Sequence, residues 1–201
     1  MSRGDRGQAH TLEGVIAAIL LLSSLTFALQ VTAVTPLSAS TSSQHIENQQ
    51  QSVAEGALTV AAENDDLKDA VLYWNESGEN FHDATRGFYV RGPPANGFGQ
   101  TLSMAYGGRG VAYNVYVSYQ TTTGSWVDQR MLYRGRPSDN AVSASRTVTI
   151  YDGNCLVDAD NTTDTGSCLD DSDVADGFYA NDVSDSGVFN VVRVEVVVWR
   201  M

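Results

Sequence analysis

RGQAHTLEG at residues 6–14 is followed directly by VIAAILLLSSLTFALQVTAV at residues 15–34, and this stretch organises the rest of the chain. Residues 14–34 are apolar for 21 positions. A helix of this length spans about 31 Å at roughly 1.5 Å per residue, close to the roughly 30 Å hydrocarbon core of a bilayer. The stretch therefore predicts a helix that crosses a membrane.

The polar side chains of this stretch are compatible with a membrane span. Ser and Thr hydroxyls can hydrogen-bond to the helix backbone, so they do not prevent insertion. Small residues let helices approach one another closely. The polar positions are Ser23, Ser24, Thr26, Gln30 and Thr32, and the small ones are Gly14, Ala17, Ala18, Ser24 and Ala28. This composition suits a helix that packs on other helices as well as on lipid.

The charges before the apolar run predict its orientation. Arg3 and Arg6 precede the run, and the positive-inside rule then places residues 1–12 in the cytoplasm and the rest outside. The run is longer than the roughly 7–15 apolar residues of an ordinary cleaved secretory signal, so we do not expect that kind of cleavage. Glu13 has two interpretations: it lies at headgroup level without a partner, or it pairs with a cation of a neighbouring copy.

The segment RGQAHTLEG and the helix after it resemble the class III leader of archaeal type IV pilins and pilin-like proteins, over residues 6–34. The resemblance implies that a cytoplasmic prepilin peptidase recognises Arg6 and cuts between Gly7 and Gln8. It implies that the helix first anchors the protein and later forms the core of a filament. It also implies that Glu13 neutralises the new terminal amine of an adjacent subunit.

The position of the glutamate departs from the family pattern by one residue. Glu is usually the fifth mature residue of such pilins, but Glu13 is the sixth when counted from Gln8. A cut after Gln8 would restore the fifth position and would break the rule that the cut follows glycine. The cleavage site is therefore open between these two bonds.

The composition limits the partners of the chain. The 201 residues include 12 cations and 24 acids; the first 35 hold two of each, so residues 36–201 carry 10 cations, 22 acids and the full net charge of −12. Such a surface repels nucleic acid and anionic lipid, so we expect neither as a partner. Lys68 is the one lysine, and this usage is typical of salt-loving archaea, where molar salt shortens the Debye length to about 3 Å.

The expected organisation is one anchor and one head. Pro36 predicts a kink or a break in the long helix, and we favour a kink. From residue 44 to 62 apolar residues recur at helical spacing and form one stripe, which could pack on the head's own sheet or on a neighbouring subunit. The stripe comprises Ile46, Val53, Ala57, Val60 and Ala61. The boundaries are 1–7 for the leader, 8–35 for the membrane or filament-core helix, 36–74 for its helical continuation and 75–201 for an extracellular head.

The head reads as an α+β fold with an antiparallel sheet of about four strands. Short helices are expected at residues 67–74, capped at Asn64 or Asp65, and at 98–106. From Val111 the apolar period changes to two. The expected strands are residues 111–120, 125–134, 143–152 and 188–200. The final strand should be well buried and should pack, with the sheet, against the second half of the long helix.

Between the last two strands lies an acidic segment, residues 152–187. Cys155 and Cys168 lie on the predicted outer, oxidising side and favour a disulfide, worth roughly 3 kcal/mol for a loop of this size. The aspartates predict either a hydrated loop or a weak calcium site. The calcium candidates are Asp158, Asp160 and Asp164, with Asn161 between them, and they lack the central Gly and terminal Glu of an EF-hand.

The remaining motifs point away from enzymatic chemistry. Asn75 and Asn161 begin two N-glycosylation sequons. The three histidines (His10, His45 and His82) accompany no recognisable nucleophile or acid pattern, so we expect no catalytic residues and no cofactor. The predicted function is a structural pilin-like subunit of an archaeal envelope assembly, with the membrane, the peptidase and other subunits as partners and a role such as adhesion. The alternative is an uncleaved, singly anchored surface protein whose head binds a ligand, in one version with calcium.

Overall fold

The computed structural model describes residues 3–108, 110–163 and 165–201, with the side chains of residues 3–9 and 31–43 outside that description. The chain forms two compact units, Met1–Ile46 and Glu47–Met201. The first unit consists of the N-terminal part of helix α1 (Arg3–Glu63), and the second contains the end of that helix and all other elements.

Helix α1 continues through Pro36. A proline inside a helix removes one backbone hydrogen bond and crowds the preceding turn, yet the residues before and after Pro36 are both helical. The chain therefore does not break at this residue, and the predicted kink stays a prediction.

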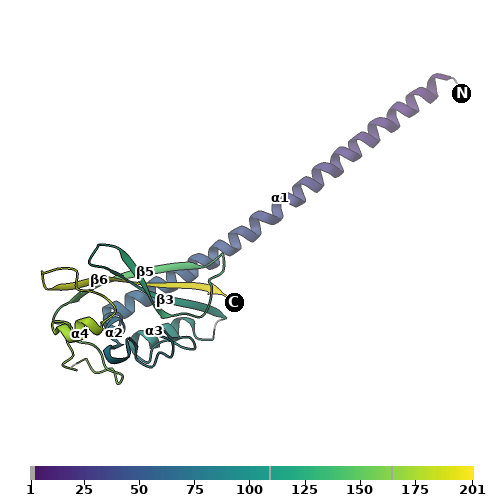
Figure 1. The fold of residues 1–201 in the computed structure, drawn as a ribbon. Coiled ribbons are helices and arrows are strands. Elements are labelled where there is room, and N and C mark those ends of the chain that lie inside the picture. Colours follow the sequence, from purple (N-terminus) through teal and green to yellow (C-terminus); the bar gives the residue numbers. More distant parts are fainter. Residues whose placement is uncertain (1–2, 109, 164) are drawn as a thin grey trace. The chain divides into compact units, whose positions relative to one another are not determined.

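The second unit combines short helices with a four-stranded sheet, and in Figure 1 helices α2, α3 and α4 lie along one side of strands β3, β5 and β6. Its elements are α2 (Asp66–Leu72), β1 (Trp74–Asn75), η1 (Glu76–Gly78), β2 (Asn80–Phe81), α3 (Gly97–Tyr106), β3 (Val111–Gln120), β4 (Trp126–Leu132), β5 (Val142–Tyr151), α4 (Ser172–Gly177) and β6 (Val188–Arg200). The predicted α+β fold with a four-stranded antiparallel sheet is confirmed.

The last strand lies in the interior of the sheet. The strand order is β4-β3-β6-β5, and every neighbouring pair is antiparallel. Val196 of β6 lies opposite Val115 of β3 and Ala144 of β5. Alternate residues of β6 are completely buried, because a strand directs every second side chain to the same face. These are Val192, Val194, Val196 and Val198, as the sequence predicted for a buried final strand.

The core of the second unit forms between one face of this sheet and the helices. The end of α1 contributes Ala54, Leu58 and Ala61 to the same cluster as the sheet valines. The prediction that the second half of the long helix packs on the sheet is thereby confirmed. Arg146 of β5 adds a polar contact, because its Nη1 donates to Oγ1 of Thr59 at 3.0 Å.

The predicted stripe packs on the head only in part, because Val60 lies outside that contact. Val60 is 48% exposed, whereas Leu58 is 1% exposed and Ala54 is buried. Ala57 and Ala61 are buried, as the stripe required. The face that meets the sheet is thus centred on Leu58, at helical spacing of three and four from its neighbours.

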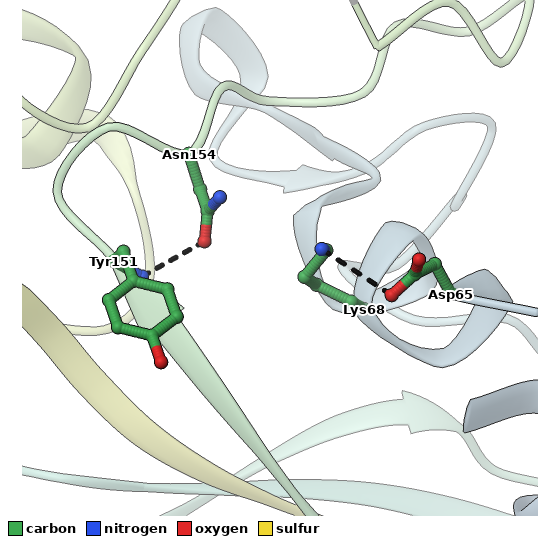
Figure 2. A network of polar contacts seen from close by, with 4 residues as sticks. All are labelled: Asp65, Lys68, Tyr151 and Asn154. Atoms are coloured by element: carbon green, nitrogen blue, oxygen red, sulfur yellow. Dashed lines mark hydrogen bonds and ion pairs between the residues drawn. The ribbon is translucent and has the colours of Figure 1, made fainter. Parts of the chain in front are cut away.

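The N-terminal caps of α2 and α3 differ. Asp65 precedes α2 in left-handed backbone conformation, and its carboxylate makes no capping hydrogen bond. Figure 2 shows that carboxylate paired with Nζ of Lys68, at 3.5 Å, beside the turn in which the amide of Tyr151 donates to Oδ1 of Asn154. In contrast, Asn96 caps α3 directly, because its Oδ1 accepts from the amide of Gly99 at 2.9 Å.

Candidate anchor and assembly sites

The apolar part of α1 leaves its large side chains uncovered. Residues His10–Gln30 form a segment that is long and apolar enough to cross a membrane by length and composition, and none of it is buried within the chain. Phe27, for example, is 69% exposed. Burying each large apolar side chain is worth about 1.5–3 kcal/mol, so water is an unfavourable environment for this surface. Contact with lipid or with other helices would remove this surface from water.

The hydroxyls inside this segment are satisfied by the helix itself. Oγ of Ser24 donates to the carbonyl of Leu21 at 2.9 Å, and Oγ1 of Thr26 donates to that of Leu22 at 2.7 Å. The prediction that these polar residues return their hydroxyls to the backbone is confirmed for both. They therefore carry no unsatisfied donor into an apolar surrounding.

Glu13 has a neighbour in its own chain. Nδ1 of His10 lies 3.4 Å from Oε2 of Glu13, one helical turn away, and the two form an ion pair when the imidazole is protonated. Both side chains are exposed, so the carboxylate stays accessible to a second cation. The predicted processing residues Arg6, Gly7 and Gln8 fall where side chains lie outside the described residues.

The two cysteines form the predicted disulfide. Cys155 and Cys168 are bonded and also face each other in an isolated antiparallel bridge. The amide of Leu156 donates to Ser167, and that of Leu169 donates to Asn154, on either side of the bond. Leu156 and Leu169 are buried in the core, so the disulfide lies where the acidic segment is attached to the head.

Two of the calcium candidates accept hydrogen bonds from backbone amides of their own loop. Oδ1 of Asp158 accepts from the amide of Ala159, and Oδ1 of Asp160 accepts from that of Thr162. Hydrogen bonds from Thr162 lower the pKa of Asp160, since they favour its charged form. Asp164 lies outside the described residues. Among the residues that are described, no three acidic, histidine or cysteine side chains converge on one point, and the three-aspartate site stays a prediction.

The two sequons differ in accessibility. Asn75 is half-buried, and its Oδ1 accepts from the amide of Gly78 at 3.1 Å. Asn161 is exposed on a loop, and its Nδ2 donates to the carbonyl of Ala95 at 3.0 Å. Asn161 is therefore the more accessible of the two predicted glycosylation sites.

The structure also assembles a group of arginines that the sequence reasoning did not identify. The amide of Tyr89 donates to Met131, and the amide of Tyr133 donates to Tyr89, both at 2.9 Å. These two bonds join residues 86–91 to residues 130–136. The joined segments carry five exposed arginines, which we call the arginine rim: Arg86, Arg91, Arg130, Arg134 and Arg136.

Aromatic rings support the rim in place of carboxylates. The guanidinium of Arg130 lies 4.7 Å from the ring centroid of Tyr133 and 5.8 Å from that of Phe88. The guanidinium of Arg134 lies 4.5 Å from the centroid of Tyr113. The sequence signal was present, since half of the ten outer cations fall in these two short stretches beside aromatic residues. Their pairing, over forty positions apart, was not predictable from spacing.

Comparison with protein-family models gives a match over residues 6–198, which includes the apolar helix and nearly all of the sheet. The chain belongs to the family DUF7288. That family is described as one of unknown function. Comparisons with curated proteins and with solved structures give no match. The DUF7288 match thus covers the apolar helix and the head together and assigns no activity to either.

Proposed function

We propose that this chain is a non-enzymatic, pilin-like subunit that is anchored and assembled through its N-terminal helix and displays its head outside the cell. The observation that supports this most is the uncovered apolar segment His10–Gln30, joined to a head with a core of its own. A helix of this kind can serve first as a membrane anchor and then as a packing surface for copies of itself.

The disulfide supports the placement of the head. A bond between Cys155 and Cys168 is stable in an oxidising compartment, which for an anchored protein means the outer side of the membrane. The N-terminus then lies in the cytoplasm, where a prepilin peptidase can reach Gly7. Glu13 then meets the terminal amine of a neighbouring copy after cleavage. Membrane, peptidase and sibling subunits are the partners, and surface adhesion is one use of the displayed head.

The test is mass spectrometry of the mature N-terminus in cells with and without prepilin peptidase. We expect a start at Gln8 or Ala9 in cells that have the enzyme, and an uncut chain in cells that lack it. Gly7→Leu should block cleavage, because the peptidase must accommodate the residue before the cut. Gly14→Ala is the matched control, since a methyl group at Gly14 meets no neighbouring atom of the chain.

An uncut N-terminus in both strains would remove the pilin-like function. The chain would then be a singly anchored surface protein whose head binds a ligand, and Glu13 would lose its proposed partner.

A further inference from the structure

We propose that the arginine rim of one copy binds the aspartates around α4 of a second copy. The inference rests on the proposed function, because it describes how heads meet in an assembly. Its starting point is that the exposed arginines of the rim form no ion pair with a carboxylate in the described structure. Within the described part of the chain, the two ion pairs are His10 with Glu13 and Lys68 with Asp65, and neither includes an arginine.

The rim is built to accept carboxylates. The guanidinium groups of Arg130 and Arg134 lie over the rings of Tyr133 and Tyr113, so their contacts are with aromatic rings and not with carboxylates. Their N–H groups lie in the plane of the guanidinium and stay available at its edge, where a carboxylate can bind two at once. Nη2 of Arg134 makes one contact, with the carbonyl of Arg91 at 3.4 Å, which holds the two segments of the rim together.

The complementary surface lies on the same chain, around α4. Asp170, Asp173 and Asp176 are exposed, and none of the three carboxylates has an ion pair in the described structure. Asp171 accepts from the amide of Asp173 at 3.0 Å and caps the helix. A strongly acidic protein with two such patches attracts its own kind at this pair of surfaces, while its other surfaces repel.

Arg134 and the residues that follow α4 lie toward opposite ends of strand β3, so this part of the rim does not meet the α4 aspartates within one head. The ring of Phe178, just after α4, contacts Phe189, and the ring of Tyr179 contacts Tyr119 near the end of β3. Arg134 contacts Tyr113, near the start of the same strand. The six residue-to-residue steps from Tyr113 to Tyr119 span roughly 20 Å of strand.

The proposed arrangement is head to tail: each copy uses its rim on one neighbour and its α4 surface on the next, which is a heterologous contact. Repetition then gives an open row of heads and not a closed dimer. At 1 M salt the Debye length is about 3 Å, so salt screens attraction between distant charges almost completely. Charges in direct contact lie within about this distance and are screened less.

The first experiment uses cysteine cross-linking of the full chain in its membrane. Thr85 lies next to the rim and Ser172 begins α4, and both are exposed. We expect the Thr85→Cys/Ser172→Cys chain, treated with a short bismaleimide, to give a ladder of dimers, trimers and longer products. Cells that co-express the two single variants should give dimers alone. The native cysteines are bonded to each other and serve as an internal control.

The second experiment reverses charge on this background. Arg91→Glu/Arg136→Glu should lower the yield of ladder at least tenfold, and adding Asp170→Arg/Asp176→Arg should restore it. Arg146→Glu/Arg193→Glu changes the net charge equally and should leave the ladder intact. Two results would overturn the contact and leave the proposed function standing. One is the absence of a cross-linked ladder although the wild-type chain forms filaments. The other is an equal loss of ladder in the rim variant and in the Arg146→Glu/Arg193→Glu control. Uncut N-termini without filaments would instead refute the proposed function, and the ladder in the membrane would still decide the contact.

Discussion

Tyr179 shows how a single polar atom is accommodated inside the head. Its ring packs against Trp74 and Phe178, with centroids 4.9 Å and 4.3 Å away, and its hydroxyl donates to the carbonyl of Val71 at 3.0 Å. Tyr89 is buried in a similar way, with its hydroxyl donating to the carbonyl of His82. Burial raises the pKa of both hydroxyls well above that of a free tyrosine, because a phenolate would lose its hydration and its donor role.

These tyrosines should make the head sensitive to alkali. Above pH ~10 the unfolded tyrosines lose their protons while the folded ones keep theirs, so the unfolded state binds fewer protons and stability falls as pH rises. The expected slope is up to about 1.4 kcal/mol per pH unit for each such tyrosine. Tyr179→Phe should reduce the slope between pH 10 and 11 in denaturant titrations. Tyr151→Phe is the control, at a side chain 52% exposed. Parallel slopes in wild type and Tyr179→Phe would contradict the assignment.

At the scale of elements, the end of α1 belongs to the head's core through one narrow face. Leu58 contributes the largest fully buried side chain of that face, between the smaller Ala54 and Ala61. The neighbouring Val60 points away from the cluster.

We expect Leu58→Ala to lower the free energy of unfolding by about 2–5 kcal/mol, because the surrounding sheet and helices cannot close the cavity fully. Val60→Ala should change it by no more than about 0.5 kcal/mol, since that side chain is largely exposed. Urea titration of the full chain in detergent, followed by near-ultraviolet circular dichroism of the head, measures both. Similar losses for the two variants would place Val60 in a contact that the head alone does not form.

The strands were the most predictable elements, because alternation of apolar and polar residues reports directly on a half-buried sheet. Expected and observed bounds of the third strand, 143–152 and Val142–Tyr151, differ by one residue at each end. The face of α1 was harder, since alanine and valine are both compatible with burial and the sheet decides which is covered. The acidic segment was the hardest to predict, because its apolar residues follow no helical or strand spacing. Leu156 and Leu169 are nevertheless buried, beside the disulfide and the backbone hydrogen bonds that hold this segment in place.

The candidate sites divide in the same way. The apolar helix and the disulfide followed from local sequence, whereas the arginine rim depends on pairing between Tyr89 and residues 131–133. Spacing carries no information on such a contact, since it is made by backbone groups that every residue has.

At the scale of the whole molecule, the apolar surface and the folded core lie in different units. Residues 47–201 contain the sheet, its helices and the disulfide, while the long run of exposed leucines lies before residue 30. We expect residues 47–201, expressed alone with the disulfide formed, to be soluble in water without detergent and to unfold cooperatively on heating. The full chain should require detergent. Size-exclusion chromatography and thermal melts measure both; aggregation of the 47–201 fragment would mean that its core depends on the missing part of α1.

The position of β6 also constrains the order in which the head can be made. β6 is the last strand to leave the ribosome, and it lies between β3 and β5, which pair with each other nowhere in the sheet. Until residues 188–200 emerge, the β3–β4 hairpin and β5 are separate pieces that share no ladder. The sheet of the head therefore stays incomplete until β6 has been made. Under the proposed function, the sheet can be completed only outside the cell, after residues 188–200 have crossed the membrane.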